Sequence, residues 1–158
     1  MIIKGLSLVN FKNHLDVDFN FNNNINCFVG NNGAGKTNVL DAIYYLAFCK
    51  SFLNVVDTQN ISHEKPFFLI KGLFVKDSED HIVSCGLKRG DFKKFKKNNK
   101  LYKKLSEHIG YYPLVLISPL DTSIILGGSG VRRKFIDSVI SQFDKNYLSD
   151  LISYNKIL

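Results

Sequence analysis

The chain has few of the residues that build disulfide-bonded or metal-stabilised folds. Its three cysteines, Cys27, Cys49 and Cys85, are odd in number, widely spaced and without a C-x-x-C pair. A disulfide framework or a zinc ribbon needs paired or regularly spaced cysteines, so the sequence argues against both. The four histidines are equally scattered. We therefore expect reduced, mostly buried thiols in a cytoplasmic protein.

Long apolar runs are also missing. No stretch of about 18 consecutive apolar residues could span a bilayer, and residues 1–7 lack the apolar core and cleavage site of a signal peptide. There is no tryptophan and there are only 3 prolines, yet 45% of the 158 residues are apolar. This composition indicates a folded globular protein, large enough to bury its own core and without a membrane partner.

Positive charge is concentrated in one segment. Residues 81–110 hold nine basic and two acidic groups, which equals the whole net charge of +7. Phe92, Phe95 and Tyr102 lie among its lysines, which include Lys93, Lys94, Lys96, Lys97, Lys100, Lys103 and Lys104. Such a cluster is typical of a duplex-DNA contact, a protein contact or simply a solvated hairpin. Because a strand has two faces, three or four of these lysines would meet one DNA surface.

The most informative stretch is residues 30–37, Gly-Asn-Asn-Gly-Ala-Gly-Lys-Thr, which match G-x-x-x-x-G-K-[ST] at every fixed position. A short apolar run precedes it at residues 25–29, and apolar residues at helical spacing follow it. Strand, glycine-rich turn and helix N-terminus together form a set of backbone N–H groups that suits a polyphosphate. The predicted nucleotide-binding residues are Gly30, Asn31, Asn32, Gly33, Ala34, Gly35, Lys36, Thr37 and Asn38.

The motif assigns a role to two side chains. Lys36 is predicted to reach the β- and γ-phosphates of ATP and is the candidate catalytic residue. The Thr37 hydroxyl is predicted to ligate Mg²⁺.

The remaining pattern predicts an α/β fold of the P-loop type. Two alternating segments, residues 2–9 and 15–21, indicate antiparallel strands before the loop, an order that is normal for ATPases of the ABC type. Further strands are predicted over residues 67–75, 81–87, 92–97 and 100–103, with buried strands at 25–29 and 112–117 forming a partial parallel sheet. The glycines of residues 127–130 divide a first lobe, 1–126, from the start of a helical second lobe, 127–158.

Taken in order, these segments resemble one family, RecF, whose ATPase head is built like those of SMC proteins and ABC transporters. Residues 6–13 resemble its L-x-L-x-N-F-R-N start, with Lys12 where arginine is frequent. Residues 30–38 resemble its G-x-N-x-x-G-K-T-N loop. Residues 96–100, 115–121 and 132–137 resemble its basic hairpin and its V-L-F-S-P-E-D and R-R-R-F-L-D segments.

The resemblance implies a head that binds ATP and Mg²⁺. It further implies an ATP-dependent homodimer that clamps duplex DNA near single-strand gaps and acts with recombination mediators in DNA repair, replication and the SOS response. In that family the signature motif, the Walker B acid and the catalytic glutamate belong to a C-terminal half that this chain does not contain. We therefore expect weak nucleotide binding and negligible hydrolysis from these 158 residues alone.

The residues alone leave two other functions open. A P-loop kinase or other phosphotransferase would use the same loop, and a DNA-binding module could carry a vestigial one. Asn10, Lys12 and Asn13 are predicted either to lie near the nucleotide or to form an ordinary polar turn.

Two more sets of charged residues have two interpretations each. Asp121 follows an apolar run, but three residues intervene, so an acid at a helix N-terminus is a better interpretation than a Walker B acid. Arg132 and Arg133 could meet DNA or an acidic partner, or pair with Asp137 one turn on.

Overall fold

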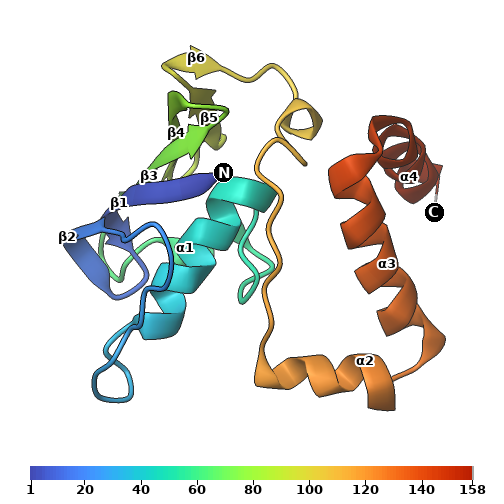
Figure 1. Ribbon diagram of the computed structural model, residues 1–158, viewed down its shortest axis with the longest axis horizontal. Helices are drawn as coiled ribbons and strands as arrows, with labels where there is room; N and C mark the ends of the chain where they lie inside the picture. Colours follow the sequence, from blue (N-terminus) through green and yellow to red (C-terminus); the bar gives the residue numbers. More distant parts are fainter. Residues whose placement is uncertain (158) are drawn as a thin grey trace.

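An antiparallel sheet forms one side of the molecule, with helix α1 (Lys36–Phe48) beside it (Figure 1). The structure, a computed structural model, describes residues 1–157 apart from the side chain of Leu120. Six strands lie in the order β2-β1-β3-β4-β5-β6, and every neighbouring pair is antiparallel. They are β1 (Ile2–Phe11), β2 (His14–Asn20), β3 (Phe67–Lys76), β4 (Glu79–Lys88), β5 (Lys94–Lys97) and β6 (Lys100–Leu101).

Two tight turns form where the sequence places turn residues. Asp77 and Ser78 connect β3 to β4, Asn98 and Asn99 connect β5 to β6, and all four have positive φ. Two-residue turns of this kind match the twist of the flanking strands, and Asn and Asp tolerate the left-handed region better than most residues. The hairpin predicted around the Asn-Asn pair therefore forms, with shorter strands than predicted.

Helix α1 (Lys36–Phe48) packs against the sheet and begins at the lysine of the motif (Figure 1). Apolar residues at helical spacing meet alternate residues of the strands, because side chains repeat every 3.6 residues in a helix and every two in a strand. The resulting core includes Val39, Ala42, Tyr45 and Leu46 of α1 with Leu6, Leu8, Phe68, Ile70, Val83 and Cys85 of the sheet. This packing fixes the position of the helix N-terminus.

The predicted parallel part of the sheet does not form among the described residues. Residues 25–29 and 112–117 were expected to be buried strands, but both are irregular and join no strand. Val29 and Ile117 are 90% and 84% exposed, whereas Tyr112 is buried. A strand needs a neighbour for its backbone hydrogen bonds, and neither segment has one, so an apolar run is not sufficient.

Three helices follow, α2 (Thr122–Leu126), α3 (Ser129–Phe143) and α4 (Lys145–Ile157). In Figure 1 they stand beside α1 and the sheet, joined to them by the irregular segment before α2. Leu158, which the predicted second lobe includes, lies outside the described residues. No helix within residues 1–157 is long and apolar enough to cross a membrane. Short 3-10 turns occur at η1 (Asp57–Asn60), η2 (Leu105–Glu107) and η3 (Pro119–Asp121).

A buried histidine joins the hairpin region to the last turn of α1. His108 is fully buried among three aromatic rings, and its Nε2 lies 2.6 Å from the Leu46 carbonyl oxygen. Burial lowers the pKa of His108 from 6.5 to about 4, although the bond to Leu46 acts in the opposite direction. The imidazole is therefore neutral at pH 7.

We expect His108 to make the fold acid-sensitive between pH 6.5 and 4. In this window the unfolded chain binds a proton that the folded chain does not, so the stabilisation is complete above pH 6.5 and is lost as the pH falls towards 4. The shift corresponds to roughly 3 kcal/mol at most. In urea titrations at pH 7 and 4.5, the wild type is expected to lose about 2 kcal/mol more than His108→Gln. An equal loss in both proteins would contradict this origin.

Candidate functional site

The motif residues form a loop that leads directly into α1. Gly30, Gly33 and Gly35 have φ values of 150°, 84° and 97°. Glycine adopts these angles without steric cost, which explains why the motif fixes glycine at positions 30 and 35, and Gly33 occupies a variable position with the same kind of angle. The first N–H groups of α1 have no partner within the helix, and with the helix dipole they attract an anion.

The loop borders a hollow of about 270 Å³ at the N-terminus of α1. The Lys36 ammonium donates to the Gly30 and Asn31 carbonyl oxygens at 2.8 Å each, so it lies across the loop. Ala34 donates its N–H to the Asn31 carbonyl at 3.3 Å. The hollow is lined by Asn32, Gly33, Gly35, Lys36, Thr37 and Asn38. Six of the nine predicted residues therefore line one space, whereas Gly30, Asn31 and Ala34 do not line it.

The turn between β1 and β2 has a more specific role than the sequence indicated. Asn13 donates its amide N–H to the Gly33 carbonyl at 3.0 Å, so it contacts the loop. Lys12 does not, because its ammonium is buried against Asp41 at 2.5 Å. Asn10 is tied through its carbonyl to the segment before β3. Of the three residues considered for the nucleotide, only Asn13 bonds to the loop.

Three of the seven clustered lysines contact other groups of the chain, and of these Lys94 stays exposed. Lys93 donates to the Asp57 carboxylate at 2.8 Å and to the Cys49 carbonyl at 2.6 Å, which links the start of the hairpin to the end of α1. Lys94 pairs with a neighbouring carboxylate, and Lys97 lies over an aromatic ring. The part-buried bonds of Lys93 hold the start of the hairpin in place, whereas the exposed pair of Lys94 contributes little.

Five lysines of the cluster are exposed on the surface, namely Lys94, Lys96, Lys100, Lys103 and Lys104. Of the interleaved aromatic residues, Phe92 is exposed, Tyr102 is half-buried and Phe95 is in the core. That three or four of these lysines meet one DNA surface stays a prediction.

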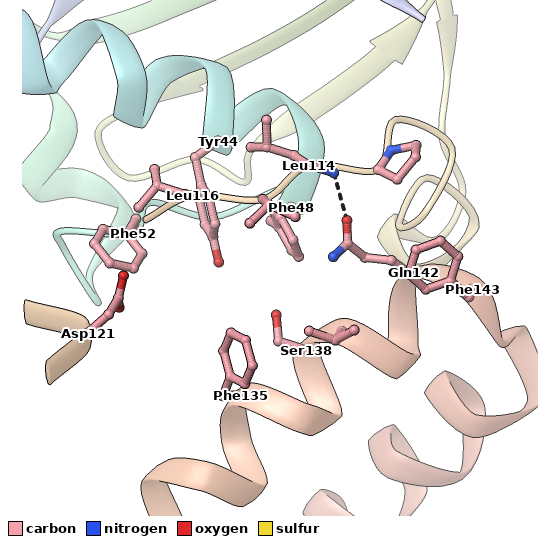
Figure 2. Close-up of a pocket in the computed structure, with 13 residues that line it drawn as sticks. Tyr44, Phe48, Phe52, Leu114, Leu116, Asp121, Phe135, Ser138, Gln142 and Phe143 are labelled. Carbon is pink, nitrogen blue, oxygen red and sulfur yellow. Dashed lines mark hydrogen bonds between the residues drawn. The ribbon is translucent and has the colours of Figure 1, made fainter. Parts of the chain in front are cut away.

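A second hollow, of about 250 Å³, lies between α1 and α3 and is mainly apolar (Figure 2). Tyr44 and Phe48 face Phe135 across it. Asp121 stands at its edge, where the carboxylate accepts from the Ser118 N–H at 2.6 Å across the 3-10 turn η3, just before α2 begins. This placement favours the interpretation of Asp121 as a helix N-terminal acid. The apolar lining of the hollow does not suit a phosphate group.

Of the two interpretations of Arg132, the structure does not show the pairing with Asp137. The Arg132 guanidinium donates to the Gly127 carbonyl at 2.8 Å, where the end of α2 leaves carbonyl groups without helical partners. Asp137 instead accepts from the Tyr147 hydroxyl at 2.6 Å, which joins α3 to α4. Both residues thus hold the C-terminal helices together.

Two of the three cysteines are buried, as expected. Burial raises the pKa of Cys49 to about 12 and also raises that of Cys85, while Cys27 is exposed. A thiol reacts as its thiolate, so Cys49 and Cys85 are unreactive at neutral pH.

Known proteins place the chain in a family. The AAA ATPase domain profile matches residues 1–147. The DNA replication and repair protein RecF of Phocaeicola vulgatus is 54% identical over the whole chain. The structure of the recombination mediator protein RecF–ATP in the RecFOR pathway is 33% identical over 98% of the chain, with a TM-score of 0.92. The chain belongs to the RecF family.

The RecF relatives are longer than this chain. It covers 43% of the Phocaeicola vulgatus protein and 42% of the solved RecF chain, and it corresponds to their N-terminal portion. A structure from work on ATP-driven dimerization of SMC ATPases is similar over 88% of the chain, with a TM-score of 0.70 and 20% identity. At that identity the similarity concerns the fold alone. The predicted head of the ABC and SMC type is confirmed.

Sequence reasoning missed two residues next to the loop. Asp41 on α1 accepts from Lys12, from the Ser51 hydroxyl at 2.7 Å and from the Phe52 N–H at 2.6 Å. His14 lies 3.1 Å from the Gly35 carbonyl oxygen. An acidic residue on the buried face of an amphipathic helix was a usable signal for Asp41, but no motif marks His14.

Proposed function

We propose that this chain is the nucleotide-binding portion of an ATP-dependent DNA repair protein of the RecF type. The observation that carries the proposal is the phosphate loop itself. Its glycines have positive φ, Lys36 lies across it, and it opens at the N-terminus of α1 in a fold similar to RecF–ATP. ATP is the nucleotide that this likeness supports.

Different groups around the hollow would bind different parts of a triphosphate. Loop N–H groups bind the phosphate oxygens, and the Lys36 ammonium moves from its carbonyl partners to the β- and γ-phosphates. Thr37 lines the hollow, and its hydroxyl is the hard oxygen donor that suits Mg²⁺. The bound Mg²⁺ would neutralise phosphate charge.

Hydrolysis by this chain alone is expected to be negligible. Among the described residues that line the hollow, none is a carboxylate or histidine that could orient a water molecule. We infer that ATP acts chiefly as a switch, and that in the whole protein it favours a homodimer on duplex DNA near single-strand gaps. Residues 1–126 would form the first lobe of that head and residues 127–158 the start of a helical second lobe.

The exposed lysines of the β5–β6 hairpin are the best candidates for a DNA contact. Lys96, Lys100, Lys103 and Lys104 are exposed and make no ion pair within the described residues, and phosphate contacts supply most of the affinity for duplex DNA. The same proposal includes that the whole protein acts together with recombination mediator proteins, takes part in the SOS response and is located in the cytoplasm.

The DNA contact can be tested with two matched sets of variants in this chain. In the first set, alanine replaces the four exposed hairpin lysines that make no ion pair within the described residues, Lys96, Lys100, Lys103 and Lys104. It replaces four exposed lysines elsewhere, Lys50, Lys65, Lys71 and Lys88, in the control set. We expect the hairpin set to weaken duplex binding and to make the slope of log K against log[salt] shallower by about 3, since each phosphate contact contributes about 0.9.

Fluorescence anisotropy over a salt series measures both quantities. If the control set weakens binding as much as the hairpin set, the hairpin is not a specific surface. If the chain binds no DNA, a kinase or phosphotransferase function gains support.

A further inference from the structure

We propose that Asn13 and His14, in the turn between β1 and β2, are positioning residues that set the shape of the phosphate loop. The inference rests on the nucleotide binding proposed above, but it concerns side chains outside the loop motif. Both residues bond to loop carbonyl groups and neither lines the hollow. They would therefore act on the nucleotide only through the loop.

Asn13 uses both ends of its amide. Its Nδ2 donates to the Gly33 carbonyl at 3.0 Å, and its Oδ1 accepts from Asn38 Nδ2 at 2.8 Å. Both bonds require the same orientation of the Asn13 amide, with its NH₂ group towards Gly33 and its oxygen towards Asn38. Asn13 thus connects the middle of the loop to the first turn of α1.

His14 holds the last glycine of the loop. Its Nε2 lies 3.1 Å from the Gly35 carbonyl oxygen, and because a carbonyl only accepts, Nε2 must carry the hydrogen. The imidazole meets the Phe19 ring edge-on at 6.1 Å, which fixes its orientation. A Cβ at Gly35 would lie 2.5 Å from Nε2, so glycine is needed here for this close approach as well as for its φ.

Fixing these carbonyls also fixes the neighbouring N–H groups. In a planar trans peptide the C=O of one residue and the N–H of the next point in opposite directions. With the Gly35 carbonyl held by His14 and by the Val39 N–H, the Lys36 N–H points out of the helix N-terminus. With the Gly33 carbonyl held by Asn13, the Ala34 N–H has only a long 3.3 Å contact within the loop, which an anion could replace.

The turn that carries both residues is itself firmly held. Lys12 donates its N–H to the Asn60 carbonyl at 2.8 Å and accepts from the Ser62 hydroxyl at 2.5 Å. Its ammonium is buried against Asp41 on α1. A site is preorganised when the residues that orient it are locked by their own partners, and this turn meets that condition.

The test distinguishes the hydrogen-bond donor of His14 from the packing of its ring, and it is made in the complete 158-residue chain. His14→Phe removes the donor and keeps a ring, whereas His14→Gln keeps an amide N–H at similar reach. Asn13→Ala removes both amide bonds. We expect His14→Phe and Asn13→Ala each to weaken Mg·ATP and inorganic triphosphate about tenfold, and His14→Gln to stay within about threefold of the wild type. Exposed control positions, His63→Phe and Asn24→Ala, are expected to change neither ligand.

Backbone ¹⁵N relaxation of the ligand-free chain gives a second readout that needs no nucleotide. The order parameters of Gly33 and Gly35 are expected to fall from about 0.85 to below about 0.6 in His14→Phe and Asn13→Ala, but not in His14→Gln. Unchanged order parameters in all variants would overturn the inference. So would wild-type affinity for Mg·ATP in His14→Phe and Asn13→Ala, provided that Lys36→Ala abolishes binding in the same assay. If the wild type binds no ATP, the proposed function fails and the relaxation data alone decide the role of the turn.

Discussion

Lys36→Ala is expected to lower the affinity of the chain for Mg·ATP about a hundredfold. The variant removes the ammonium that faces the phosphates and the two bonds that hold Gly30 and Asn31 across the loop. A hydrogen bond to a charged group contributes about 1.5–3 kcal/mol, and a hundredfold change corresponds to about 2.7 kcal/mol. Titration with a fluorescent ATP analogue measures the change.

The control for this variant is Lys50→Ala, which removes an exposed lysine just beyond the other end of α1. It carries the same change of net charge, so any general electrostatic effect on ATP would appear in both variants. Within the described residues the Lys36 ammonium bonds to loop carbonyl groups alone. The thermal unfolding midpoint of Lys36→Ala is therefore expected to stay near that of the wild type. An affinity within threefold of the wild type for Lys36→Ala would support the vestigial-loop alternative.

Lys12→Met is expected to destabilise the fold by about 3–5 kcal/mol, the range observed when one partner of a buried ion pair is removed. The side chains of Lys12 and Asp41 are 9% and 1% exposed. Without the ammonium, the Asp41 carboxylate stays buried with only two neutral donors, from Ser51 and Phe52. Urea unfolding at pH 7 measures the loss.

Two further variants identify the ion pair as the cause. Lys12→Arg keeps a cation and is expected to cost much less than Lys12→Met. Combining Lys12→Met with Asp41→Asn removes the unpaired charge and is expected to recover part of the loss, so that the two changes are not additive. A loss below about 1 kcal/mol for Lys12→Met would show that water reaches Asp41 and that the pair is not buried in solution.

The features that the sequence predicted correctly depend on neighbouring residues. The phosphate loop and the start of α1 follow from the order of residues 30–37, and the turn at Asn98 and Asn99 follows from two residues that tolerate positive φ. The antiparallel strands before the loop follow from an alternating pattern. In each case the cause lies within a few residues of the effect.

The predictions that failed depended on distant partners. Residues 25–29 and 112–117 have the composition of buried strands, but a strand also needs a neighbour that no local pattern supplies. No local pattern indicated that Lys12 and Lys93 pair with acids, because their partners Asp41 and Asp57 lie 29 and 36 residues away in the sequence. The role of Asn13 was only partly visible for the same reason, because its contact with the loop crosses 20 residues.

The most direct test of the account is a crystal structure of this chain with Mg²⁺ and a non-hydrolysable ATP analogue. We predict the β- and γ-phosphates in the hollow of residues 30–38, with Lys36 Nζ and loop N–H groups about 2.7–3.2 Å from phosphate oxygens and the Thr37 hydroxyl on the metal. A nucleotide bound in the apolar hollow between α1 and α3, or no nucleotide at saturating concentration, would contradict it.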